Sequence, residues 1–188
     1  MANSDSPFGL RPVKHLDGSP WNGAVNKYYI PATDQTAVFV GDAVKLAGSA
    51  DANGVPTVAQ AAAGDTLLGA VVSFEPDSDN PTLNYRPAST ARYCYVCDAP
   101  DVIFEVQEDS VGGALAAADI GNNVDLVVGS GSTTTGQSGM ELDSSSKTTS
   151  TAQMRILRLV QREDNEIGTN AKYECLINEH VFKTTTGT

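Results

Sequence analysis

Positive charge is scarce in this sequence. Its 188 residues contain 12 Lys and Arg against 23 Asp and Glu, which gives a formal net charge of −11. Proteins that bind DNA or RNA cluster basic residues so that counterions are released from the phosphates, and no run of basic residues occurs here. We therefore expect no nucleic-acid partner.

Long apolar runs and cysteine pairs are also lacking. No stretch reaches the roughly 20 apolar residues that a membrane-spanning helix needs. The opening residues 1–8 lack the basic and apolar regions of a secretory signal peptide. The three cysteines, an odd number, do not suggest a disulfide framework. We expect no membrane partner and assembly in a cytoplasm.

The sequence offers a weak zinc motif. Cys94 and Cys97 form a C-x-x-C, and Cys175 with His180 could complete four ligands. Both segments look like strands, in which residues three or five apart point to opposite faces. Zinc needs its ligands to converge on one point. We expect buried, chemically inert cysteines, and neither metal nor cofactor.

Catalytic motifs are equally weak. The stretch Gly136-Gln-Ser-Gly-Met has Met140 where a nucleophile elbow needs glycine, and the chain has two histidines to act as a base. Asp77-Ser-Asp-Asn resembles the start of a calcium loop, but its sixth position is Thr82 instead of glycine. A pair of acids close in space, as in glycosidases, is not recognisable from spacing. We expect no catalytic residues and no enzyme.

What the sequence does contain is a pattern of short β segments. In residues 102–107, Val102, Phe104 and Val106 alternate with Glu105 and Gln107, as on a strand with one buried face. Strands are expected near residues 37–46, 55–59, 66–76, 92–97, 102–107, 123–128, 155–161 and 173–182. Gly, Pro, Asn and Asp separate them. The fold class predicted is all-β, an antiparallel sandwich or barrel of jelly-roll-like type.

Two segments depart from that pattern. A turn or two of helix is expected at residues 114–118. Residues 129–151 are mostly Gly, Ser and Thr, and predict a long exposed loop with a short anchored strand at Met140-Glu-Leu-Asp. These elements belong to one predicted domain, residues 31–188.

Residues 1–30 lack periodicity yet keep large apolar groups. Prolines and glycines interrupt the segment, while Phe8, Trp21, Tyr28 and Tyr29 are spaced along it. Disordered tails seldom hold so many aromatic residues. We predict an extended N-terminal arm, which either wraps its own domain or docks on another chain. These four residues are the candidate interface anchors.

Several stretches together resemble a known group of proteins. They are Ser6-Pro-Phe-Gly-Leu-Arg-Pro-Val, Asn22-Gly, Tyr29-Ile-Pro-Ala, Val40-Gly-Asp-Ala-Val, Gly64-Asp-Thr-Leu-Leu-Gly-Ala-Val-Val, Gly136-Gln-Ser-Gly-Met-Glu-Leu-Asp and Ile156-Leu-Arg-Leu. In these the chain is similar to the small head, cement or decoration proteins of tailed bacteriophages. The resemblance covers most of the chain and rests on turns and strand ends, so it brings no active-site residues.

The resemblance implies a virion structural protein that stabilises the capsid by bridging subunits of the major capsid protein. It also implies a small symmetric oligomer of the chain with itself, for which a homotrimer suits a threefold capsid position better than a dimer does. An acidic surface favours the capsid exterior, because DNA inside the shell would repel it. The alternative is a tail- or fibre-associated virion protein that contacts the host surface, for which the 129–151 loop would be suited.

Overall fold

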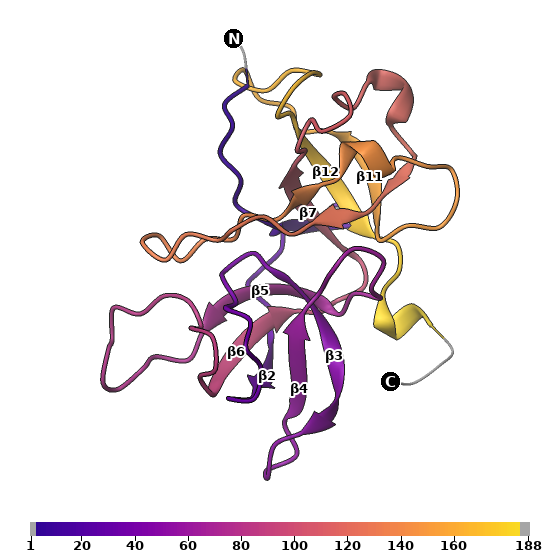
Figure 1. The fold of residues 1–188 in the computed structure, drawn as a ribbon. Helices are drawn as coiled ribbons and strands as arrows, with labels where there is room; N and C mark the ends of the chain where they lie inside the picture. Colours follow the sequence, from indigo (N-terminus) through magenta and orange to yellow (C-terminus); the bar gives the residue numbers. More distant parts are fainter. Residues whose placement is uncertain (1–2, 185–188) are drawn as a thin grey trace.

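The computed structural model describes residues 3–184, and they fold as an all-β protein, which confirms the predicted fold class. Figure 1 shows a barrel at the bottom and a second sheet stacked above it. The barrel is closed and its strands run in the order β2 (Asn26–Ile30), β4 (Pro56–Gln60), β3 (Ala43–Ala50), β5 (Gly69–Phe74) and β6 (Arg92–Cys97).

The second sheet has five strands, in the order β1 (Arg11–His15), β7 (Val102–Gln107), β12 (Lys172–Ile177), β11 (Met154–Leu159) and β8 (Asn123–Val124). A separate ribbon pairs β9 (Leu126–Val127) with β10 (Glu141–Leu142). Helical structure among the described residues consists of the 3₁₀ turns η1 (Ala117–Asp119), η2 (Ser144–Ser146) and η3 (Val181–Lys183). The first of these overlaps the helix predicted at residues 114–118.

Strand pairing is antiparallel almost throughout. The exception is the contact that closes the barrel, where β2 and β4 run parallel and Tyr29 lies opposite Thr57. Closure leaves the barrel without a free edge, which removes a template for pairing with other chains.

Both edges of the five-stranded sheet are covered by loops. Beside β1, the amide of His15 donates to the carbonyl of Ser19 at 2.8 Å. Beside β8, Asn123 and Thr148 exchange two backbone hydrogen bonds of 2.8 Å. The sheet therefore also presents little unpaired backbone at its edges.

The two regions have separate hydrophobic cores that meet along β5 and β6. On β5, Ala70 belongs to the core of the sheet and the next residue, Val71, to the core of the barrel. The buried side chain of Gln153 joins the regions further, because its amide nitrogen donates to the barrel carbonyls of Ala62 and Asp65 at 2.8 Å each. The molecule is therefore one packed unit, in which adjacent residues of the same strand belong to different cores.

Strand β7 follows the predicted alternation but is buried on both faces. Phe104 lies in the core of the sheet. On the opposite face, Glu105 pairs with Arg162 at 2.7 Å, and Gln107 is fully buried beneath Asp5 of the N-terminal segment. The polar face expected from sequence is therefore a covered polar layer and not a solvated one.

The extended N-terminal arm is not confirmed, and the predicted division at residue 30 corresponds to no break in the fold. Residues 11–15 and 26–30 are strands of the sheet and of the barrel. The preceding segment runs along the sheet (Figure 1), where the amide of Ser6 donates to the side-chain oxygen of Gln107 at 3.2 Å. In this chain the aromatic-rich N-terminus covers its own domain.

Residues 129–151 were predicted to be a long exposed loop with a short anchored strand, and more of this segment is buried than expected. The anchored strand expected at Met140-Glu-Leu-Asp is present as β10. Ser138, Met140 and Leu142 are at most 2% exposed. Residues 128–140 form a long hairpin that projects between the barrel and the sheet (Figure 1), and its closing strand packs into the core. Methionine and leucine among the small polar residues supply the burial that fixes it.

Candidate binding surface

Four segments meet where the barrel and the sheet adjoin: the N-terminal segment, the chain before β3, strand β5 and the 128–140 hairpin. The amide of Leu10 donates to the carbonyl of Gly41 at 2.8 Å, and the amide of Gly41 donates to Val71 of β5 at 2.8 Å. From the other side, the amide of Ser138 donates to the carbonyl of Val40 at 2.8 Å. We call this meeting point the junction.

Glycine makes the junction tight. Gly9 has a φ of 73°, and a Cβ placed there would lie 2.3 Å from the carbonyl oxygen of Gly41. Gly41 has a φ of 94°, and its Cβ would lie 2.3 Å from the carbonyl oxygen of Phe8. Only glycine combines this backbone conformation with so close an approach of two chains.

A buried carboxylate supports the junction from inside. Asp42 is 1% exposed and accepts hydrogen bonds from the amide of Phe39 at 2.9 Å and from the side chain of Gln60 at 2.7 Å. Burial raises the pKa of Asp42 above its usual range, and these hydrogen bonds together with one from Ser138 oppose that rise. The carboxylate fixes the turn at Gly41-Asp42 that the sequence indicated.

The surface of the junction is hollowed into a cleft of 170 Å³. Its lining is mainly apolar and comes from the N-terminal segment, the chain before β3 and strand β5: Phe8, Leu10, Trp21, Val40, Val71 and Val72. Arg11 and Gln137 add polar groups to the same lining. The Arg11 guanidinium carbon lies 4.3 Å from the centre of the Phe8 ring. The cleft thus combines an apolar floor with one cation.

Two of the four candidate anchors meet in this cleft and two do not. Phe8 and Trp21 line it. Tyr28 is 6% exposed in the barrel core, and its hydroxyl donates to Asp98 at 2.6 Å. Tyr29 packs against Tyr93, with the ring centres 5.1 Å apart. Tyr28 is thus a residue of the barrel core.

The cysteines lie where strand alternation placed them, in different cores. Cys94 belongs to the barrel core, whereas Cys97 and Cys175 belong to the core of the sheet. All three are free and buried. Burial raises the pKa of Cys94 and of Cys97 to about 12, so both are protonated thiols at neutral pH.

The histidines also stand apart from Ser138. His15 contacts Asp101 at the surface, with 3.0 Å between ring nitrogen and carboxylate oxygen. His180 is fully buried and its Nδ1 accepts the amide of Phe182 at 3.1 Å. Burial lowers the pKa of His180 to about 4. The Ser138 oxygen accepts a 3.0 Å hydrogen bond from Met140, so it closes a turn of the hairpin.

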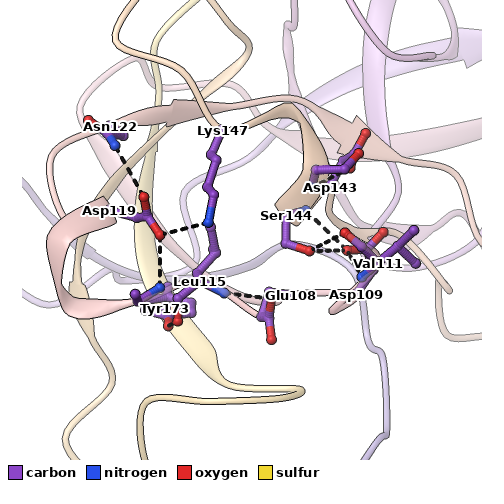
Figure 2. Close-up of polar contacts among 12 residues, drawn as sticks. Glu108, Asp109, Val111, Leu115, Asp119, Asn122, Asp143, Ser144, Lys147 and Tyr173 are labelled. Atoms are coloured by element: carbon purple, nitrogen blue, oxygen red, sulfur yellow. Dashed lines mark hydrogen bonds and ion pairs between the residues drawn. The ribbon is translucent and has the colours of Figure 1, made fainter. Parts of the chain in front are cut away.

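An acidic region lies in the loops that follow β7 and surround β10 and η1 (Figure 2). Its carboxylates accept hydrogen bonds from loop atoms: Asp109 from the amide and hydroxyl of Ser144 at 3.0 and 2.8 Å, and Glu108 from the amide of Leu115 at 3.2 Å. Lys147 bonds to Asp119 at 3.2 Å. These acids hold the loops around β10 and η1 in place, which is a structural role.

Two buried arginines were missed from sequence. Arg86 is fully buried, and its guanidinium donates to backbone carbonyls at the end of the barrel, of Pro31, Asp34, Thr36 and Thr90. Arg92 is 8% exposed and donates to carbonyls of the 75–91 loop. The sequence did contain a signal for Arg92, because it lies two residues before Cys94 on β6 and so points to the same buried face. None was available for Arg86.

Within residues 3–184 no group of three or more His, Cys, Asp or Glu is placed to hold a metal ion. No helix in this described part is long and apolar enough to cross a membrane. Comparison with protein-family models, with curated proteins and with solved structures finds no match to the chain.

Proposed function

We propose that this chain is a structural protein of a bacteriophage particle, which binds the outside of the capsid and bridges subunits of the major capsid protein. One observation carries the proposal. Four of the stretches in which the sequence resembles phage cement proteins come together at the junction: residues 6–13, 40–44, 64–72 and 136–143.

These stretches are far apart in the chain, yet backbone hydrogen bonds tie them together. Leu10 bonds to Gly41, Gly41 to Val71, and Val40 to Gly136. The shared residues thus build one surface with a cleft, instead of being scattered over unrelated turns. A surface of this kind suits a binding protein, because its shape is formed before the partner arrives.

The proposal includes a location and a form of assembly. The net charge of −11 favours the outer surface of a shell that holds DNA. Contact with several capsid subunits at once gives avidity without strong individual sites. Self-association, as a trimer in preference to a dimer, would match a threefold position. Light scattering on the purified chain gives its oligomeric state.

The deciding experiment is the copy number of the protein in purified particles. A capsid-bound protein is expected at a level close to that of the major capsid protein, in intact and in tail-stripped particles alike. Quantitative mass spectrometry on both preparations measures it. Absence from particles overturns the proposal.

A tail- or fibre-associated role is the second candidate, and the 128–140 hairpin favours it. The hairpin projects from the body, and Thr133, Thr134 and Thr135 at its tip are exposed. Polar residues on a fixed projection suit contact with a host surface. This role predicts a low copy number that disappears when the tails are removed.

A further inference from the structure

The cleft at the junction has the size of a side-chain pocket. Its 170 Å³ is slightly larger than the cavity of about 150 Å³ that takes up benzene in an engineered protein core. Its apolar lining includes Phe8, Leu10 and Trp21 together with Val71 and Val72 of β5. One aromatic ring or branched aliphatic group therefore fits.

The cleft also carries a cation that is free to bind. Arg11 is exposed, and within residues 3–184 its guanidinium contacts the Phe8 ring but takes part in no ion pair. Glu105 lies opposite Arg11 in the pairing of β1 with β7 and is already paired with Arg162 at 2.7 Å. The guanidinium can thus offer two parallel N–H groups to an incoming carboxylate.

From this combination we propose that the cleft binds an apolar side chain of a partner protein that has a carboxylate next to it. The apolar group fills the space between Trp21 and Val72, and the carboxylate pairs with Arg11. The partner's identity as the major capsid protein rests on the proposed function, whereas the chemistry of the cleft does not.

The walls of the cleft are held in place before binding. Leu10 is pinned by its hydrogen bond to Gly41, and the indole nitrogen of Trp21 donates to the carbonyl of Ala24 at 3.3 Å. Little conformational entropy is then lost when a side chain enters, which is the condition under which a small pocket contributes to affinity.

A fluorescence titration tests the proposal on the intact protein. Trp21 is the single tryptophan of the chain, so its emission reports on the cleft alone. The probes are N-acetylphenylalanine, which has a ring and a carboxylate, and N-acetylphenylalanine amide, which lacks the charge. We expect saturable changes with both, and an affinity for the acid at least about fivefold higher, since hydrogen bonds to charged groups are the stronger ones.

Two variants complete the design. Arg11→Gln is expected to bind both probes equally and weakly, because it removes the charge and leaves the apolar lining. Arg158→Gln, which changes another exposed arginine outside the cleft lining, is expected to keep the preference for the acid. A titration without saturation, or a preference for the acid that survives in Arg11→Gln, overturns the proposal. Because no capsid is used, the result is independent of the copy number in particles.

Discussion

The barrel and the five-stranded sheet differ in the charges that they bury. Among residues 3–184 both buried arginines belong to the barrel, which also buries Asp42 and Asp98, whereas the sheet buries carboxylates without a buried cation. At the end of the barrel, Arg86 and Arg92 are enclosed and bonded to carbonyl oxygens of the surrounding loops. In the sheet the enclosed charges are carboxylates, such as Glu105, which pairs with Arg162, and Glu108, which accepts an amide.

This difference follows from what each side chain can bind. A guanidinium carries five N–H donors in a plane, so one arginine can collect the carbonyls of several loops. A carboxylate accepts, and so it collects amides and hydroxyls of turns. The loops at this end of the barrel are therefore held by arginine donors, whereas the loops at the margin of the sheet are held by carboxylate acceptors.

The largest expected effect comes from removing a barrel donor. Arg86→Met removes a fully buried donor from four carbonyls, of which those of Pro31 and Asp34 keep a backbone hydrogen bond and those of Thr36 and Thr90 lose their side-chain donor. We expect a loss of about 3 kcal/mol in the free energy of unfolding. Urea unfolding followed by circular dichroism measures it. Arg158→Met, at a side chain that is 57% exposed, is the control and should change stability by less than about 0.5 kcal/mol. Equal losses in the two variants would contradict the role of the buried arginine.

The next effect concerns the glycines where the two regions join. Gly9 and Gly23 have similar φ values, 73° and 85°, but a Cβ at Gly9 meets Gly41, whereas a Cβ at Gly23 meets nothing within 4 Å. Gly23→Ala is expected to cost about 1 kcal/mol from backbone strain alone. Gly9→Ala should cost about 2 kcal/mol or more, because the close contact adds to the strain. Thermal unfolding of both variants measures the two losses of stability. Equal losses would show that the backbone at the junction shifts to accommodate the added Cβ.

A smaller effect is expected at the margin of the sheet. The amide nitrogen of Gln107 donates to both Glu141 and Asp5 at 3.0 Å, which places two carboxylates side by side. Burial, with Asp5 adding repulsion, raises the pKa of Glu141 to about 7 from its usual 4.5. The folded state therefore favours the protonated form, and its stability falls as pH rises from 4.5 to about 7.

Glu141→Gln removes this dependence and keeps an oxygen that Gln107 can bond to. Because the site is partly open to solvent, the variant should be more stable than the native chain by about 1 kcal/mol at about pH 8, and equal to it at about pH 4.5. Urea unfolding at both pH values gives the difference. Glu163→Gln, at an exposed position, serves as the control. A difference that is the same at both pH values would contradict the raised pKa of Glu141.

The smallest difference is expected in the urea concentration at which the thiols of the two cores become reactive. Cys94 reports on the barrel, and Cys97 with Cys175 on the sheet. Because β5 and β6 contribute to both cores, we expect the regions to unfold together and all three thiols to become reactive over the same range of urea. Alkylation followed by mass spectrometry resolves each cysteine. Earlier labelling of Cys94 would show that the barrel opens by itself.

Strand positions followed well from local sequence, because alternation and turn residues record which face is buried. Residues 92–97 and 102–107 are strands as predicted. The opposite placement of Cys94 and Cys97 also followed from alternation.

The pairing of strands that lie far apart in the chain could not be predicted from the sequence. Strand β1 contains Pro12 and lacks an alternating pattern, and its partner β7 lies about 90 residues further along the chain. Short-range patterns carry no information on such a partner, so residues 11–15 looked like part of an arm. The cleft escaped prediction for the same reason, since it forms only where four distant segments meet.

The contacts of residues 3–15 with segments far along the chain set the order in which parts of the fold can form during synthesis. Asn3 donates to the carbonyls of Glu166 and Thr169, and β7 pairs on one side with β1 and on the other with β12. The segment around Asn3 therefore reaches its final place only after residues 166–169 have been synthesised. The barrel, complete at residue 97, can close earlier. The cleft is lined by residues from Phe8 to Gln137, so it is complete only after the 128–140 hairpin has been synthesised, later than the barrel.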